Sequence, residues 1–203
     1  MNDAMSQVNA IGKKKVLVGF TGSVASTRFA SLIRALRDAD CDIKVVLTNR
    51  AMEFIGEEDI ARAEINREDV YTDRDEWERW REIGDPVVHV DLAKWADVLL
   101  VAPLSANTLS KFANGLCDNL LTCIFRAWDF SKIVVIAPAM NTQMWINPFT
   151  SRHLETLADI SRGAVRVCTP IEKRLACGDI GVGAMAEVSQ VIEFLFVQSP
   201  STS

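Results

Sequence analysis

The feature that most constrains the fold is a series of short, almost wholly apolar segments, each followed by a turn and then by polar or helical sequence. Strands that are apolar along their whole length are typical of parallel sheets covered by helices on both faces. The alternation therefore predicts an α/β fold, a doubly wound parallel sheet in a three-layer sandwich of the flavodoxin-like or Rossmann-like kind. Four segments are predicted as strands and the pattern allows a fifth: Lys15–Phe20, Ile43–Thr48, Val98–Pro103, Ile133–Ala137 and Val165–Thr169.

The same pattern predicts where ligands bind and how the chain is divided. Crossovers between parallel strands are right-handed, so the loops that follow the strands gather along one edge of the sheet, where ligands of such folds bind. Residues 1–14 are predicted to form a flexible leader and residues 15–203 a single domain. The charged segment 56–86 contains Trp77 and Trp80 and is expected to be an excursion from the sheet.

Composition and charge exclude several classes of protein. The formal net charge is −5 at pH 7 and no basic tract is present, which disfavours binding to nucleic acid or to an anionic membrane. No apolar stretch is long enough to span a bilayer and no signal peptide is evident, so a cytoplasmic location is expected. The five scattered cysteines lack metal-type spacing, so no metal site is predicted and they are expected to be reduced thiols. Cys41, Cys117 and Cys123 are expected to be small core residues.

The first strand-end loop places small residues between a strand and a helix. Gly22, Ser23, Val24 and Ala25 follow the first strand, and Thr48 stands at the end of the second. Unpaired backbone N–H groups at a helix start favour a phosphate, so the loop indicates a nucleotide or flavin phosphate site. The loop lacks both the Walker lysine and the three-glycine dinucleotide fingerprint. A tight turn that merely begins a helix is the alternative.

The loop after the third strand is unusually polar. Ser105, Asn107 and Thr108 lie within four positions, around Ala106. All three are residue types that cap helices, but one cap needs only one of them. The surplus of uncharged donors and acceptors suits a flavin ring edge, a ribityl chain or a phosphate.

The loop after the fourth strand carries an amide between apolar side chains. Asn141 could hold a carboxylate without adding charge, and Met144 supplies apolar surface. A capped helix with a methionine on its core face is the alternative.

Two further stretches contain residues able to transfer protons. His89 is a candidate acid or base because the pKa of imidazole is near neutral, whereas His153 is expected to be a surface residue. Cys177 precedes three glycines and follows Arg174, an arrangement that suits a lid closing over an anionic substrate. A structural histidine and a surface loop with an incidental cysteine are the alternatives.

With these segments in view, the chain resembles the flavin-containing cysteine decarboxylases, and among them the phosphopantothenoylcysteine decarboxylases of coenzyme A biosynthesis. The resemblance extends from about Lys15 to Phe196, with its motifs in order. It is carried by Gly22–Ala25, Asp85–His89, Trp95–Asp97, Ala102–Leu109, Gly115–Thr122, Pro138–Thr142 and Leu175–Asp179.

The resemblance implies bound FMN and a homotrimer with active sites at the subunit interfaces. His89, Asn141 and Cys177 match the family's catalytic residues, and Cys177 would protonate an enethiolate intermediate. Substrate contacts are implied for Asn141, Met144, Arg174 and Ala176. Cofactor contacts are implied for Gly22, Ser23, Val24, Ala25, Thr48, Arg50, Ser105, Ala106, Asn107, Thr108 and Ala139.

Two other functions fit the same fold. Some relatives regulate a protein phosphatase, but those regulators often carry long acidic tails, and no such tail is seen in this sequence. A flavin enzyme acting on another substrate, such as a peptide that ends in cysteine, is the second alternative.

Overall fold

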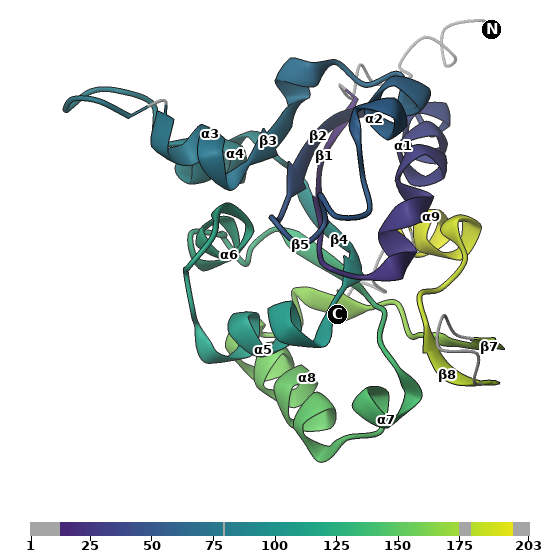
Figure 1. The fold of residues 1–203 in the computed structure, drawn as a ribbon. Coiled ribbons are helices and arrows are strands. Elements are labelled where there is room, and N and C mark those ends of the chain that lie inside the picture. Colours follow the sequence, from purple (N-terminus) through teal and green to yellow (C-terminus); the bar gives the residue numbers. More distant parts are fainter. Residues whose placement is uncertain (1–12, 79, 175–179, 197–203) are drawn as a thin grey trace, which may run out of the picture.

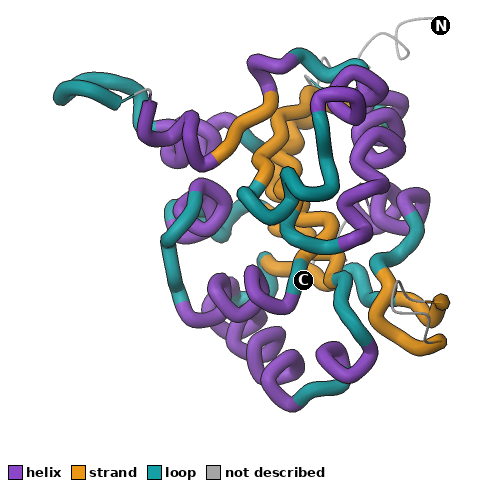
Figure 2. Tube along the Cα trace, viewed as in Figure 1, coloured by secondary structure: helices purple, strands orange, loops and turns teal. Residues whose placement is uncertain are grey.

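The computed structural model describes residues 13–78, 80–174 and 180–196 and contains a parallel sheet between two layers of helices (Figures 1 and 2). Six strands pair in the order β3-β2-β1-β4-β5-β6, and every neighbouring pair is parallel. The order reverses between β1 and β4, which is the switch point of a doubly wound sheet. The predicted fold class is confirmed. The strands are β1 (Lys14–Phe20), β2 (Cys41–Leu47), β3 (Val70–Thr72), β4 (Val98–Leu104), β5 (Ile133–Pro138) and β6 (Val165–Val167).

Two hydrophobic cores lie on opposite faces of the sheet, as the mostly apolar strands predict. Side chains alternate along β1, so Val16 and Val18 enter one core while Leu17 enters the other. The first core is covered by α1 (Phe29–Asp38), α2 (Glu57–Ala63) and α9 (Val188–Phe196). The second is covered by α4 (Val88–Trp95), α5 (Ala106–Asn114), α6 (Leu120–Arg126) and α8 (Pro148–Ser161). Short helices complete the fold: η1 (Val24–Arg28), η2 (Arg67–Asp69), α3 (Asp73–Glu78) and α7 (Thr142–Trp145).

The prediction for segment 56–86 is wrong in its first half. Ile60 and Ala63 of α2 are buried in the first core, and β3 joins the sheet beside β2, with all three of its residues buried. Three residues are too few to show a strand pattern, which is why the sequence did not reveal β3. The end of α3 and residues 80–87, by contrast, project from the body (Figure 1).

A second, two-stranded sheet was not predicted. β7 (Ile171–Arg174) and β8 (Ile180–Ala184) form an antiparallel hairpin beside α7. Gly183 has a φ of +151°, and a Cβ there would collide with the carbonyl oxygen of Met140. The N–H of Met140 donates to the carbonyl of Gly183 at 2.9 Å. The hairpin is therefore fixed to the loop that follows β5. Within the described residues, no helix is long and apolar enough to cross a membrane.

Candidate active site

A cavity of about 470 Å³ opens at the carboxyl ends of the strands, at the switch point between β1 and β4. Its walls come from the loops after β1, β2, β4 and β5, as expected for a ligand site in a doubly wound sheet. Most of the predicted cofactor contacts line it, together with Met144: Gly22, Ser23, Thr48, Arg50, Ser105, Ala106, Asn107, Thr108 and Ala139. Val24 and Ala25 begin η1 and are not among the lining residues.

Thr21 joins the two loops that flank the switch point. Its side chain is fully buried, and its hydroxyl donates to the carbonyl of Pro103 at 2.8 Å. The same hydroxyl accepts from the N–H of Ser105, also at 2.8 Å. The loops after β1 and β4 are therefore held at a fixed separation by one side chain. No sequence motif marks Thr21, because its hydroxyl positions two loops that are distant in sequence.

The loop after β1 presents bare backbone to the cavity. A Cβ on Gly22 would lie 2.6 Å from the Cβ of Arg50, so no side chain fits there. Ser23 caps η1, its Oγ accepting from the N–H of Ala25 at 3.4 Å. The Arg50 side chain is largely exposed at the rim and lies 4.0 Å from Glu53. A glycine packed against an arginine allows a phosphate to approach the backbone next to a positive charge.

The loop after β4 contains both a cap and a surplus of polar groups. Ser105 caps α5, since its Oγ accepts from the N–H of Thr108 at 3.3 Å. Thr108 is buried, and the two hydroxyls lie 3.2 Å apart. Asn107 is exposed and lines the cavity. The cap therefore accounts for Ser105 and Thr108, whereas Asn107 takes no part in it and lines the cavity.

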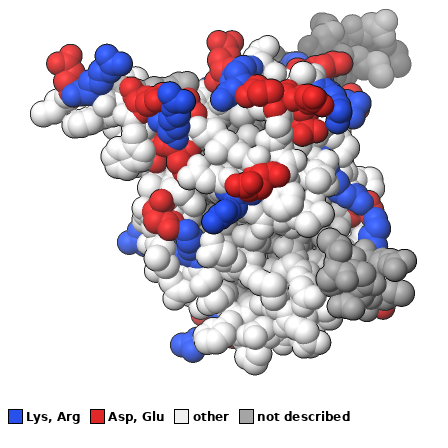
Figure 3. Space-filling view, in the orientation of Figure 1, with Lys and Arg blue, Asp and Glu red and all other residues white. Residues whose placement is uncertain are grey.

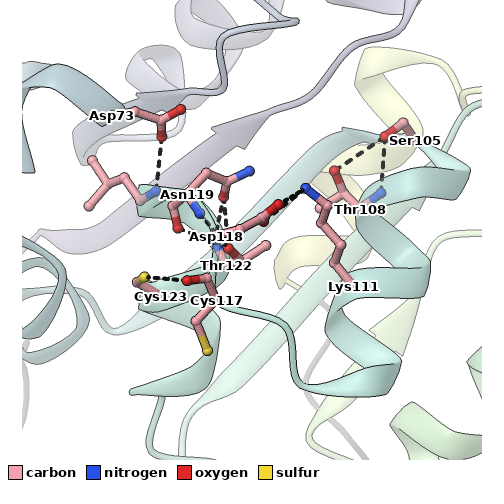
Figure 4. A network of polar contacts seen from close by, with 10 residues as sticks. Asp73, Ser105, Thr108, Lys111, Cys117, Asp118, Asn119, Thr122 and Cys123 are labelled. Atoms are coloured by element: carbon pink, nitrogen blue, oxygen red, sulfur yellow. Dashed lines mark hydrogen bonds and ion pairs between the residues drawn. The ribbon is translucent and has the colours of Figure 1, made fainter.

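A wall that the sequence analysis missed is built from α3, α5 and α6 (Figure 4). Lys111 donates to both carboxylate oxygens of Asp118, at 2.8 and 2.6 Å. Asn119 caps α6, and Asp73 accepts from the N–H of Leu120 at 2.9 Å. Burial raises the pKa of the Asp73 carboxyl above its ordinary value. Asp118 and Asn119 fall in the motif Gly115–Thr122, but nothing in the sequence places that motif beside Asp73, so only the packing of α3, α5 and α6 reveals the wall.

Asn141 lies at the start of α7, next to the hairpin. Its Oδ1 accepts from the N–H of Gln143 at 2.8 Å, so it is also the cap of that helix. The flanking residues Met140 and Met144 line the cavity. Gly181 of β8 packs directly against the Thr142 side chain. The capping interaction predicted as the alternative is present, and Asn141 itself is not among the residues that line the cavity.

His89 lies apart from these residues. It is in the first turn of α4, half-buried, and is not among the residues that line the cavity. Its Nδ1 is hydrogen-bonded to Oε1 of Glu76, which comes from α3 and is itself nearly buried. A carboxylate on Nδ1 orients the ring and leaves Nε2 for proton transfer. Glu76 precedes His89 by thirteen residues, and no motif signals the pair.

The remaining predicted residues concern the hairpin and the cysteines. Cys177 and Ala176 lie outside the described residues, and Arg174 is the last residue of β7. Their roles stay predictions. The expectation of core cysteines holds for Cys41, which is buried, but is wrong for Cys117, which is exposed where the chain turns between α5 and α6.

Cys123 is only half-buried, and its Sγ donates to the carbonyl of Cys117 at 3.6 Å. Burial raises the pKa of the Cys123 thiol to about 11, so the thiol is protonated near neutrality and is a weak nucleophile. Across the described part of the chain, no cluster of three or more His, Cys, Asp or Glu side chains could hold a metal ion.

Comparison with known proteins matches this arrangement to one family. The model of the Flavoprotein family matches residues 5–198. The chain is 52% identical over 179 residues to the phosphopantothenoylcysteine decarboxylase of Oryza sativa subsp. japonica, covering 88% of this chain and 78% of the rice protein. It is 46% identical over 181 residues to that of Mus musculus, covering 89% and 84%. The chain belongs to the phosphopantothenoylcysteine decarboxylase family.

Solved structures related to this family share the fold. A cysteine-to-serine mutant of PPC decarboxylase, complexed with pantothenoylaminoethenethiol, gives a TM-score of 0.83 at 47% identity, covering 91% of this chain and 97% of that chain. The FMN binding protein AtHal3 gives a TM-score of 0.78 at 47% identity, covering 91% and 95%. The family resemblance seen in the motifs is thus confirmed over the whole doubly wound domain.

Proposed function

We propose that this chain catalyses the FMN-dependent decarboxylation of 4′-phosphopantothenoylcysteine to 4′-phosphopantetheine, a step of coenzyme A biosynthesis. One observation carries the proposal: the loops predicted to bind FMN converge on a single cavity at the switch point of the sheet. The identity of 52% to a phosphopantothenoylcysteine decarboxylase supports the substrate, and the similarity to an FMN binding protein supports the cofactor.

The residues of the cavity fit FMN. Its volume of about 470 Å³ is within the range of cofactor pockets. Gly22 allows a phosphate to approach the backbone, and Arg50 beside it supplies a positive charge. Ser23, Thr48 and Asn107 provide the uncharged donors and acceptors that a ribityl chain and a ring edge require. These residues would hold the cofactor, and Met144 would give it apolar contact.

The reaction needs an electron sink, because direct loss of CO2 from a cysteine carboxylate would leave an unstabilised carbanion. Bound FMN would supply this electron sink, because a flavin can take up and return a hydride, and the net reaction would then not be an oxidation. Asn141 holds the substrate carboxylate through its amide, which adds no charge. The N–H of Gln143 donates to Oδ1 and fixes the orientation of that amide.

Two residues move protons in this proposal. His89, oriented by Glu76, accepts the thiol proton at Nε2 or orients the thiolate. Cys177 protonates the enethiolate that remains after decarboxylation. Support for a cysteine in this role comes from the related PPC decarboxylase, whose cysteine-to-serine mutant is complexed with an enethiol compound.

The proposal includes a homotrimer with its sites at subunit interfaces. His89 does not line the cavity at the switch point of its own chain. A second copy of the chain would therefore bring its histidine to the substrate. Apolar side chains on the projecting segment support such contact, because Trp77 is 77% and Ile83 98% exposed. Sedimentation equilibrium tests the mass. We also propose a cytoplasmic location, which suits the free cysteines of the described residues.

The test of the reaction is direct. Purified protein loaded with FMN should release CO2 from 4′-phosphopantothenoylcysteine and form 4′-phosphopantetheine. Asn141→Asp should keep the flavin spectrum yet lose turnover roughly a hundredfold or more, because two carboxylates about 4 Å apart repel by about 4 kcal/mol at an effective dielectric constant of about 20. Asn66→Asp, which adds the same charge outside the cavity, should behave like the parent. Inability to bind FMN, or bound FMN without CO2 release, would refute the proposal.

A further inference from the structure

One carboxylate joins parts of the molecule that are distant in sequence. Glu187 lies between β8 and α9, and its Oε1 accepts a hydrogen bond from Nζ of Lys173 on β7 at 2.8 Å. Its Oε2 accepts from the guanidinium of Arg28, the last residue of η1. Each carboxylate oxygen therefore has its own cation, and one side chain connects η1 to the hairpin of β7 and β8. Nothing in the proposed chemistry uses this connection.

On one side of this connection lies the loop that follows β1, residues 21–23, here called the cofactor loop. Ser23 lines the cofactor cavity and caps η1, which contains only five residues and ends at Arg28. Ser26 of η1 is fully buried, and its hydroxyl donates to the carbonyl of Thr21 at 2.8 Å. The cofactor loop and η1 are therefore tied together, so a ligand that fixes Ser23 also restrains Arg28.

On the other side, the hairpin is held at a single position along its length. Lys173 pairs with Gly181 across the two strands. A Cβ on Gly181 would lie 2.4 Å from the hydroxyl oxygen of Thr142, which is buried and has no hydrogen-bond partner among the described residues. The contact of β8 with α7 at this position is therefore one of packing, whereas β7 is held by charge through Glu187.

Glu187 is itself fixed in place and charged. Its N–H donates to Oε1 of Gln190 at 3.0 Å, and the preceding residue, Ala186, is buried in the first core. Hydrogen bonds from Arg28 and then Lys173 lower the pKa of the Glu187 carboxyl to about 2, so the group is ionised at neutral pH. The visible face over α5, α7 and α8 carries few charges, whereas the region over α2 and α3 is densely charged (Figure 3). Since α7 packs beside β8, the carboxylate meets few competing charges on that side of the hairpin.

We propose that Glu187 is a positioning residue that couples the cofactor loop to the hairpin, so that FMN bound beside Ser23 also steadies β7 and β8. The inference rests on the proposed function and deepens it, because β7 ends at Arg174, a predicted substrate contact. Coupling between two sites is reciprocal, so a firmly attached hairpin also strengthens FMN binding. An ion pair with a purely structural role would stabilise the fold without linking the hairpin to the cofactor.

The test measures the hairpin and the cofactor separately, and neither measurement needs turnover. Amide hydrogen exchange of residues 171–174 and 180–184 is followed with and without FMN, and FMN affinity is measured by fluorescence titration. In the parent protein, FMN should slow exchange in the hairpin by about twofold or more. Glu187→Gln should remove most of this protection and weaken FMN binding about twofold, a modest effect because the ion pairs are partly exposed. Glu187→Lys, which places three cations together, should weaken FMN binding by about fivefold or more. The matched control Glu172→Gln removes the same charge from an exposed position on β7 and should change neither measurement.

Cross-effects give the sharper readout. Arg28→Gln lies outside the hairpin, yet it should speed exchange in the hairpin. Lys173→Gln lies outside the cofactor loop, yet it should weaken FMN binding. Neither change should have a further effect when Glu187→Gln is already present, because the connection is then broken.

The outcomes separate this inference from the proposed function. If Glu187→Gln leaves the FMN-dependent protection of the hairpin unchanged, or if Arg28→Gln and Lys173→Gln each affect only their own element, the inference is overturned. Protection that depends on Glu187, in protein that binds FMN but releases no CO2, would support the coupling and refute the decarboxylation. If the protein binds no FMN, the proposed function fails, and hairpin exchange in Arg28→Gln still decides the coupling: faster exchange supports it and unchanged exchange overturns it.

Discussion

Replacing Thr21 by valine should loosen the crevice between β1 and β4. The side chain is fully buried, and its hydroxyl forms 2.8 Å hydrogen bonds to Pro103 and from Ser105. Valine keeps the shape of threonine but leaves a carbonyl and an N–H unpaired. An unpaired buried group costs about 1–3 kcal/mol, and the N–H of Ser105 is only partly buried and can recruit water. The free energy of unfolding should therefore fall by about 2–4 kcal/mol.

Urea denaturation of the protein without cofactor measures this loss, and fluorescence titration measures FMN affinity in parallel. FMN should bind at least several-fold more weakly, because the loops bearing Ser23 and Ser105 are no longer tied together. Thr21→Ser is the control: it keeps the hydroxyl, loses one methyl group, and should cost about 1 kcal/mol. A valine variant within about 0.5 kcal/mol of the parent, and with unchanged FMN affinity, would show that Thr21 does not hold the crevice.

Two further predictions concern charged groups. Burial raises the pKa of the Asp73 carboxyl in the folded protein, so its ionised form destabilises the fold at high pH. This destabilisation is lost as the pH falls through the folded-state pKa. At pH 7, Asp73→Asn keeps an acceptor for the Leu120 N–H, so its free energy of unfolding should match or exceed that of the parent. Asp73→Ala removes the acceptor and should lower the free energy of unfolding by about 1 kcal/mol. Equal losses for the two variants in urea denaturation would contradict this account. Hydrogen bonds from Arg28 and then Lys173 lower the pKa of Glu187 from 4.5 to about 2, so the stability it contributes is present above pH 4.5 and is lost as the pH falls towards 2. At pH 7, Glu187→Gln should lower the free energy of unfolding by about 0.5 kcal/mol or less, because solvent screens these exposed ion pairs. Near pH 2 the substitution should change nothing. A difference that persists at low pH would exclude the ion pairs as its cause.

The pattern of apolar segments was enough to predict the fold class and the edge of the sheet where the site lies. Segments such as Val98–Leu104 are apolar at every position, and a strand with this pattern must be buried on both faces. In a parallel sheet the loops after such strands necessarily meet at one edge. The polar residues of those loops, including Ser23, Thr48 and Asn107, could therefore be assigned to one edge of the sheet, and they line one cavity there.

Contacts between residues distant in sequence depend on the tertiary structure. The wall joins Asp73 of α3, Lys111 of α5 and Asp118 of the turn before α6. Glu76, also on α3, reaches His89 on α4. The strand Val70–Thr72 is stabilised by parallel pairing with the edge of β2, since three residues alone do not determine a strand. Local sequence patterns indicate burial and turns along the chain. Contacts between helices depend instead on how the two cores pack, and this packing decides which groups face the substrate.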